Sequence, residues 1–143
     1  MKLMTLVVPW AEKGAGAYLN GQPIRVSDIK DLSRATVSSG NIKSFARSRL
    51  WAGFGDLIGR AYSTRGYGDF VHYHLLARGA LDVVIESDIN ILDIAALTVI
   101  VTEAGGTFTD LAGHAVDLDT ISVLATNGPL HDEVREVLSG QGG

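Results

Sequence analysis

A long apolar helical pattern in the stretch from Glu86 to Gly106 constrains the fold more than any other part of this sequence. The pattern starts near Asp93 and ends at Gly105-Gly106, a glycine pair that suits the left-handed turn that closes helices. It offers almost no polar face, so we expect most of this helix to be buried. The residues behind that expectation are Ile94, Ala95, Ala96, Leu97, Val99, Ile100, Val101 and Ala104.

Three acidic residues precede or open this helix, and they admit two interpretations. Glu86 and Asp88 follow an apolar strand predicted over Leu81–Glu86, and Asp93 stands at the start of the helix. An aspartate there is most often a cap, whose carboxylate accepts hydrogen bonds from free backbone N–H groups. The alternative is a metal or phosphate site built on the helix end, where the helix dipole favours negative charge and an anion. The local sequence leaves both interpretations open.

Composition and charge exclude several classes of protein. The 143 residues suit one domain, 1–143, and 12 basic against 16 acidic residues argue against a nucleic-acid or membrane-surface role. The absence of cysteine excludes disulfides and thiolate chemistry and is consistent with a cytoplasmic protein. The apolar run Leu3–Val8 is too short for a signal peptide or a membrane span. A mean hydropathy of +0.20 predicts that another chain covers part of the surface.

Strand patterns alternate with helix patterns along the chain, which predicts a layered α/β fold. A hairpin near the start favours a mixed sheet over a purely parallel one, because Asn20-Gly21 is a strong two-residue turn signal. Gly14 and Gly16 are consistent with a phosphate loop, but no helix pattern follows them, so a bulged hairpin is the better interpretation. The predicted strands are 3–8, 35–39, 81–86, 107–110 and 121–126, and the predicted helices are 42–62, 70–78, 93–104 and 130–138.

A second stretch with functional potential is the turn Ser63–Asp69, which opens onto the predicted helix 70–78. Backbone N–H groups at such a turn can hold an anion such as phosphate. Asp69 suits a helix cap, and the alternative is contact with a cationic part of a substrate. His72 and His74 point in different directions on a helix, so we expect packing or surface roles for them and not joint metal ligation.

Several of these motifs together resemble the inositol monophosphatase family. Leu92–Ala96 followed by Val101–Gly106 is similar to the family's carboxyl-terminal signature, in which a Trp-Asp pair opens a helix ending in Glu-Ala-Gly-Gly. The segments Gly14–Gly21, Gly79–Asp82 and Ala125–Asn127 resemble further segments of that family in the same order, and Arg65–Asp69 is most similar to the histidinol-phosphatase branch. The resemblance implies the layered mixed-sheet sandwich of this family, as its carboxyl-terminal half only.

This resemblance implies a cytoplasmic, magnesium-dependent hydrolase that acts on a small phosphorylated metabolite, histidinol phosphate being one candidate, and that forms a dimer. Carried over by motif, Asp93 would be a metal ligand. Glu86 would contact the organic part of the substrate, and Gly68 and Asp69 would lie beside the phosphate and the substrate. The metal ions of such an enzyme hold the phosphate and activate the attacking water.

The sequence departs from the family pattern in two places. Leu92 replaces the family's tryptophan. More seriously, the chain has no Asp-Pro and no Asp-Gly, so the family's upstream glutamate and Asp-Pro-x-Asp-Gly-Thr motif are missing. Magnesium needs several oxygen ligands, so we assign no catalytic residue and expect the chain to be truncated and inactive alone. Three hypotheses stay open: a phosphatase fragment, a non-catalytic remnant that self-associates or binds, and one half of a split phosphatase.

Overall fold

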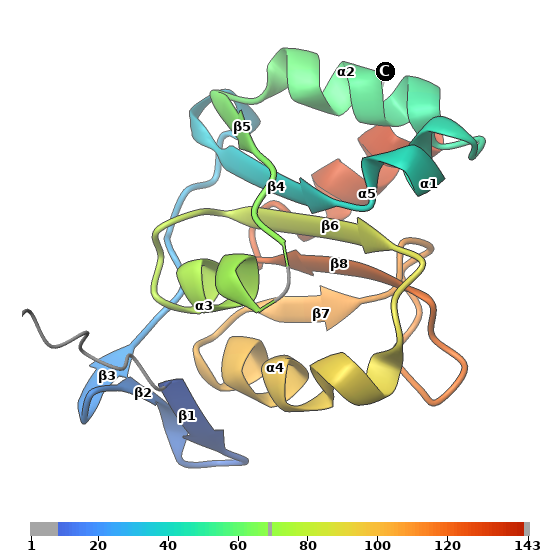
Figure 1. The fold of residues 1–143 in the computed structure, drawn as a ribbon. Helices are drawn as coiled ribbons and strands as arrows, with labels where there is room; N and C mark the ends of the chain where they lie inside the picture. Colours follow the sequence, from blue (N-terminus) through green and yellow to red (C-terminus); the bar gives the residue numbers. More distant parts are fainter. Residues whose placement is uncertain (1–8, 69, 142–143) are drawn as a thin grey trace, which may run out of the picture.

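The computed structural model describes residues 9–68 and 70–141. Within these ranges a small antiparallel sheet lies beside a larger mixed sheet with helices on both faces (Figure 1). This arrangement confirms the layered α/β fold expected from the sequence. The predicted strand Leu3–Val8 and the residue Asp69 lie outside the described residues.

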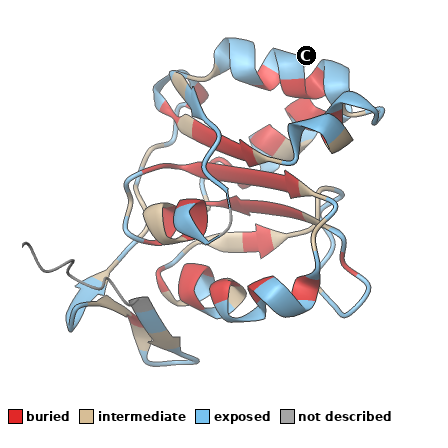
Figure 2. Cartoon of the chain, in the orientation of Figure 1, coloured by how far each residue is buried: buried red, intermediate tan, exposed pale blue. Residues whose placement is uncertain are grey.

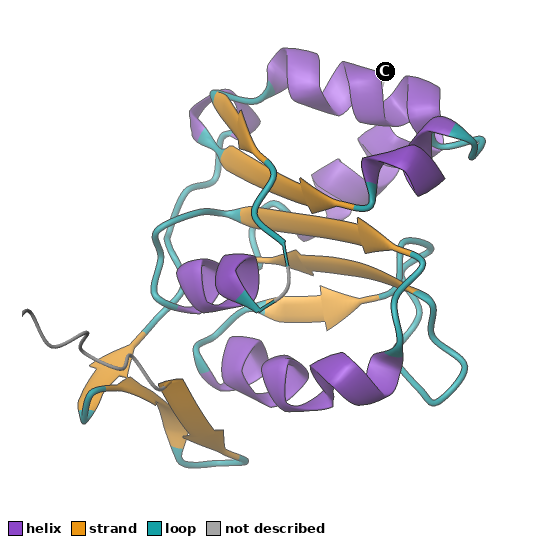
Figure 3. Cartoon of the chain, viewed as in Figure 1, coloured by secondary structure: helices purple, strands orange, loops and turns teal. Residues whose placement is uncertain are grey.

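Figure 3 shows the helices and strands of the described residues. Most boundaries are close to those predicted, but strand β1 was not predicted and the predicted helix 42–62 is divided. The small sheet contains β1 (Pro9–Glu12), β2 (Gly16–Leu19) and β3 (Gln22–Ile24), and the large sheet contains β4 (Thr36–Gly40), β5 (Ser63–Arg65), β6 (Val83–Ser87), β7 (Thr107–Thr109) and β8 (Ser122–Thr126). The helices are α1 (Ile42–Ala46), α2 (Trp51–Arg60), α3 (Val71–Ala77), α4 (Ile91–Glu103) and α5 (His131–Ser139), with a short 3-10 turn, η1, at Leu32–Arg34. The short edge strand β5 was not predicted.

The large sheet is mixed, in the strand order β5-β4-β6-β8-β7. Strands β5, β4 and β6 run parallel, whereas β8 is antiparallel to both β6 and β7. The chain passes from β5 through α3 to β6 and therefore crosses over β4. As a result α3 and α1–α2 lie on opposite faces of the sheet, and all three parallel strands end at the same edge.

Alternating side chains divide the interior into two cores, one on each face of the large sheet. Val84 of β6 contributes to the core beneath α3 and α4, while its neighbours Val83 and Ile85 contribute to the core beneath α1, α2 and α5. This period of two is what a strand buried on both faces requires. Figure 2 shows the resulting buried central strands between exposed outer helix faces.

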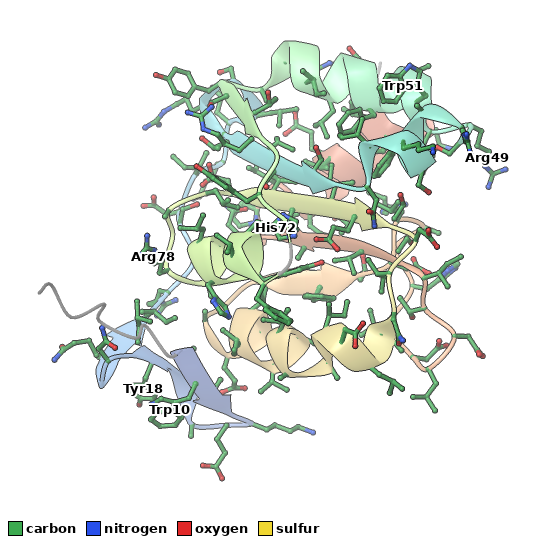
Figure 4. The ribbon with its side chains drawn as sticks, in the orientation of Figure 1. Trp10, Tyr18, Arg49, Trp51, His72 and Arg78 are labelled. Atoms are coloured by element: carbon green, nitrogen blue, oxygen red, sulfur yellow. The ribbon has the colours of Figure 1, made fainter. Side chains whose placement is uncertain are left out.

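The small sheet contains the hairpin predicted at Asn20-Gly21. Both residues have positive φ, 52° and 76°, as a tight two-residue hairpin turn demands. On the surface of this sheet the rings of Trp10 and Tyr18 stack at a centroid distance of 4.5 Å, and Figure 4 shows them side by side. A hydrogen bond near the small sheet ties the chain to the end of α4. The Val26 N–H, two residues after β3, donates to the Ala104 carbonyl at 3.0 Å.

The single helix predicted over residues 42–62 is wrong, because the chain breaks it into α1 and α2. Ser48 causes the break: its Oγ donates to the Phe45 carbonyl at 2.9 Å and accepts from the Leu50 N–H at 3.1 Å, which replaces helical bonding. The predicted apolar stripe is also only partly buried, since Trp51 and Ile58 are exposed. The expectation of close helix packing holds at Gly53, where a Cβ would lie 2.1 Å from the Leu138 carbonyl oxygen of α5.

The expectation that most of α4 is buried is wrong for the described chain. One face of α4 packs between the two sheets, but Leu92, Ala95, Ala96 and Val99 are exposed, Leu92 at 72%. Their spacing of three and four residues places them on one side of the helix. We call these four residues the α4 stripe. Within the described residues, only one side of α4 has neighbours to bury it.

Among the described residues, none of the helices has both the length and the apolar character that crossing a bilayer requires.

Candidate active-site half

The candidate site lies where the parallel strands β5, β4 and β6 end, at one edge of the large sheet. In open α/β sheets ligands bind outside the carboxyl ends of parallel strands, where successive connections leave for opposite faces. Here β4 leads into α1, β5 leads through the turn at residues 66–70 into α3, and β6 leads into α4. These three connections bring together the residues that the sequence assigned to a site.

Two of the connections begin with a residue in a rare backbone conformation. Asn41 follows β4 with φ 55°, and Asp88 follows β6 with φ 56°. The Asn41 side-chain amide joins the two connections, donating to the Ser87 carbonyl at 2.6 Å. Non-glycine residues in this region carry strain that surrounding contacts must offset, and such residues gather at functional sites. The backbone itself therefore marks this edge of the sheet.

Asp93 lies in the first turn of α4 but does not cap it. The cap is Asn90, whose side-chain oxygen accepts from the Leu92 N–H at 3.0 Å. The cap interpretation of Asp93 is therefore wrong, and its carboxylate is exposed at a helix end where the dipole favours negative charge. Asp93 lines an open cavity of about 300 Å³, whose other walls include Asn41, Phe70 and Asp88.

Glu86 is the penultimate residue of β6 and is almost completely buried, at 7% exposure. Its carboxylate contacts Nε2 of His72, a fully buried residue of α3 that Figure 4 shows between the helix and the sheet. On its other side the Glu86 side chain lies over Gly40, its register partner in β4, where an added Cβ would meet Glu86 Cγ at 3.0 Å. Glu86 is thus held between α3 and β4. His72 has the packing role expected, with a specific partner.

The other ring nitrogen of His72 continues this set of contacts to the turn before α3. Nδ1 lies 3.0 Å from the Ser38 hydroxyl, and the same hydroxyl accepts from the Tyr67 N–H at 3.2 Å. Tyr67 directly precedes Gly68, which is exposed in the turn as an anion-binding residue would be. Asp69, the other predicted residue of this turn, lies outside the described residues.

Tyr73 lies next to His72 in α3 and shares the same environment. Its ring meets the His72 ring edge-on, at a centroid distance of 4.6 Å. Burial raises the pKa of the Tyr73 hydroxyl, and the negative charge of Glu86 raises it further. The hydroxyl is therefore neutral throughout the physiological pH range.

The glycine-containing loop between β1 and β2 binds an anion that belongs to the chain itself. The Gly16 N–H donates to Oε1 of Glu103 at 2.8 Å. Hydrogen bonds from the backbone of Gly16, Gly14 and Ala15 hold the pKa of Glu103 below its ordinary value. The loop is a hairpin turn, as the sequence favoured over a phosphate loop, and it ties the small sheet to the end of α4.

A second polar cluster lies at the opposite edge of the large sheet. Asp82 is buried, accepting a hydrogen bond from the Ser27 hydroxyl and another from the Thr36 N–H, the latter at 2.8 Å. Asn127 donates to the Ser27 hydroxyl at 3.1 Å and to the Ile29 carbonyl at 2.7 Å. These residues belong to two of the segments that resemble the family, and their position gives them a structural role away from the site.

The described residues do not provide a complete metal site. No cluster of three or more histidine, aspartate or glutamate side chains with metal-binding geometry occurs within 9–68 and 70–141. Magnesium takes about six oxygen ligands. Asp93 can supply one carboxylate at the cavity rim, but the residues described here do not fit a catalytic metal pair.

Sequence reasoning located Asp93, Glu86 and Gly68 but did not find what holds them. It missed Ser38, and it did not connect His72 with Glu86. It also missed Asn41, and it named Asp88 only as one of three acids without predicting its backbone conformation, although an asparagine or aspartate directly after a strand is a residue type that tolerates positive φ. That signal is weak in a single sequence, because such residues are common in loops.

Comparison with known proteins assigns this fold and site to a class. The sequence model of the inositol monophosphatase family matches residues 4–140. The chain is 40% identical over 130 residues to a histidinol-phosphatase of Mycobacterium tuberculosis, covering 87% of this chain and 50% of that protein. It is 36% identical over 121 residues to human inositol monophosphatase 2, covering 80% and 42% of the two chains.

Solved structures agree with the sequence matches. An inositol monophosphatase of Thermotoga maritima superimposes with a TM-score of 0.84 at 31% identity, covering 94% of this chain and 52% of that one. An inositol monophosphatase of Anabaena gives a TM-score of 0.84 at 28% identity, covering 94% and 54%. The fold is therefore that of about half of an inositol monophosphatase. The chain belongs to the inositol monophosphatase family, and it spans about half the length of the relatives it matches.

Proposed function

We propose that this chain supplies one side of a magnesium-dependent phosphomonoesterase site, and that a second polypeptide segment must supply the remaining carboxylate ligands. The observation that carries the proposal is Asp93. Asn90 caps α4, so the Asp93 carboxylate is not used as a cap. It lines a cavity at the edge where three parallel strands end. Family membership gives that carboxylate its chemistry, because a metal ion at such a site neutralises the charge of the phosphate and activates water.

Within this site we assign roles to the other residues named from the sequence. The turn containing Gly68 and Asp69 would bind the phosphate through backbone N–H groups. Glu86 would contact the organic part of the substrate at the end of β6, where its side chain keeps a small exposed edge. The substrate we favour is histidinol phosphate, a candidate supported by the similarity to histidinol-phosphatases of M. tuberculosis and Streptomyces coelicolor. A cytoplasmic location and a dimeric state complete the proposal.

A complementation experiment tests this proposal. The purified chain is assayed with Mg²⁺ on histidinol phosphate and on inositol monophosphate, first alone and then with a polypeptide comprising the part of the M. tuberculosis relative outside the match. We expect no turnover from the chain alone and Mg²⁺-dependent turnover from the mixture. Asp93→Asn should abolish that turnover, whereas Asp119→Asn, an exposed loop acid, should preserve it.

The same experiment separates the alternatives. Robust turnover by the chain alone would contradict the argument from missing ligands. A stable complex of the two polypeptides that never turns over either substrate would favour a non-catalytic remnant that works by association. The exposed α4 stripe is the observation that favours this second candidate, because it is an apolar surface that the described residues leave uncovered.

A further inference from the structure

Two buried side chains, those of Ser38 and His72, connect the turn before α3 to Glu86. Starting from the turn, the Tyr67 N–H donates to the Ser38 hydroxyl, that hydroxyl contacts Nδ1 of His72, and Nε2 of His72 pairs with Glu86. Ser38 and His72 are fully buried, and each comes from a different element, β4 and α3. The contacts therefore link the turn, two parallel strands and a helix beneath the candidate site.

The direction of each hydrogen bond follows from the chemistry of the partners. An ionised carboxylate can only accept, so the hydrogen between His72 and Glu86 belongs to Nε2. The Ser38 oxygen already accepts from Tyr67, which leaves its own hydrogen for donation to Nδ1. One arrangement of hydrogens is consistent with all three contacts: Tyr67 N–H towards Ser38, Ser38 O–H towards Nδ1, and Nε2–H towards Glu86. The partner of one ring nitrogen thus selects the tautomer that binds the carboxylate at the other.

We propose that Ser38 and His72 are positioning residues, which hold the Glu86 carboxylate at a fixed place and orientation relative to the phosphate-binding turn. Gly40 lies against the other side of Glu86, where an added Cβ would crowd the Glu86 side chain at 3.0 Å and push it from this position. This inference rests on the proposed function of Glu86 and of the turn. The inference adds that His72 sets the distance between the turn that would bind the phosphate and Glu86, which would bind the organic part of the substrate.

Such a link has a clear chemical use. A small phosphorylated alcohol or amine presents its phosphate and its organic part at a fixed separation. A site that holds the partners of both groups rigidly gains affinity, because little ordering remains to be done on binding. Without His72 the buried Glu86 carboxylate would lose a neighbouring N–H donor, and a buried polar group without such a partner is unfavourable.

The first experiment reads the histidine directly in the chain alone. In ¹⁵N-histidine-labelled protein, we expect ring-nitrogen shifts for His72 that show a protonated Nε2 and a bare Nδ1. Ser38→Ala removes the hydroxyl at little cost in packing, and it should abolish this fixed tautomer and raise amide exchange at Tyr67 about tenfold. His74→Gln is the matched control on the same helix and should change neither reading. A His72 that samples both tautomers in the unsubstituted chain would overturn the proposal.

The second experiment uses the reconstituted enzyme and separates positioning from mere structural support. Ser38→Ala and His72→Gln should raise KM for histidinol phosphate about tenfold, while KM for para-nitrophenyl phosphate stays within about twofold. His72→Gln retains an N–H donor that can reach Glu86, so we expect this variant to stay folded. Equal effects on both substrates would show that the link only supports the fold.

The two experiments also distinguish failure of this inference from failure of the proposed function. Absence of turnover in the reconstituted mixture would contradict the proposed function, and the ring-nitrogen spectra of the chain alone would still decide whether Ser38 and His72 hold Glu86. Turnover with an unchanged KM in both variants would instead retain the function and remove the positioning role.

Discussion

Individual residues account for much of how this half-fold is held together, and Glu103 is one of them. The hydrogen bonds from the loop at Gly14–Gly16 keep its pKa low in the folded chain. The unfolded chain therefore binds a proton more readily, so this interaction stabilises the fold above about pH 4.3 and is lost as the pH falls further.

Glu103→Gln tests that contribution. The variant keeps the size of the side chain but removes its charge, so the free energy of unfolding should fall at neutral pH. Its dependence on pH should also become flatter below about pH 4.3, because the titrating group is gone. Urea denaturation at a series of pH values measures both effects. Glu136→Gln, on the exposed side of α5, should leave the slope unchanged.

Asp82 is the residue whose loss should damage the fold most. Asp82→Ala leaves the Ser27 hydroxyl and the Thr36 N–H without their acceptor in a buried place. We expect the free energy of unfolding to fall by about 2–4 kcal/mol, since each buried donor left unpaired costs about 1–3 kcal/mol. Denaturant unfolding provides the measurement, with Asp119→Ala as a control expected to change it by less than about 0.5 kcal/mol. A loss as small as that of the control would contradict the structural role of the cluster.

At the scale of elements, we expect alanine substitutions at two glycines of α2 to change the unfolding free energy in opposite directions. Gly53→Ala would place a Cβ 2.1 Å from the Leu138 carbonyl oxygen, and backbone cannot yield as a side chain can. We expect α2 and α5 to separate and the unfolding free energy to fall by about 1–3 kcal/mol. Gly55→Ala meets nothing within 4 Å and should instead stabilise α2 by about 0.5–1 kcal/mol. Thermal unfolding of the two variants side by side decides the matter. Equal shifts would show that the α2–α5 contact is looser than described.

Elements whose signals are local were predictable from the sequence, and those that depend on distant neighbours were not. The turn at Asn20-Gly21 and the strand ending at Gly40 are specified by adjacent residues. The burial of α4 was predicted wrongly, because an apolar helix pattern shows that a surface needs covering but not whether the chain itself covers it. The edge strand β5 has only three residues, too few for a periodic pattern.

The candidate site divides in the same way. Asp93 and the turn at Gly68 were found through motifs that are continuous in the sequence. The contacts of Ser38, His72 and Glu86 join positions up to 48 residues apart and depend on the crossing of α3 over β4. A single sequence carries no sign of that pairing, because a serine in a strand and a histidine in a helix are each most simply explained by packing.

At the scale of the whole molecule, the α4 stripe predicts association. Its four apolar residues are exposed along one side of α4, and Leu92 stands where the resemblance places a tryptophan. We expect the chain to self-associate at high concentration, and sedimentation velocity at several concentrations measures this. Leu92→Gln combined with Val99→Gln should shift the population towards monomer. Leu118→Gln removes an even more exposed leucine from a loop and should not. A monodisperse monomer at every concentration would contradict the prediction.

The Trp10–Tyr18 stack gives the molecule a built-in optical probe. The chain has two tryptophans, one on the small sheet and the other, Trp51, on α2 at the far side of the large sheet. Figure 4 shows how far apart these two layers place them. Replacing Trp51 by phenylalanine leaves an emission signal from the small sheet alone. A polypeptide that binds against that sheet would then change the wavelength or the intensity of the Trp10 fluorescence. Binding could be followed in this way without a label and without turnover.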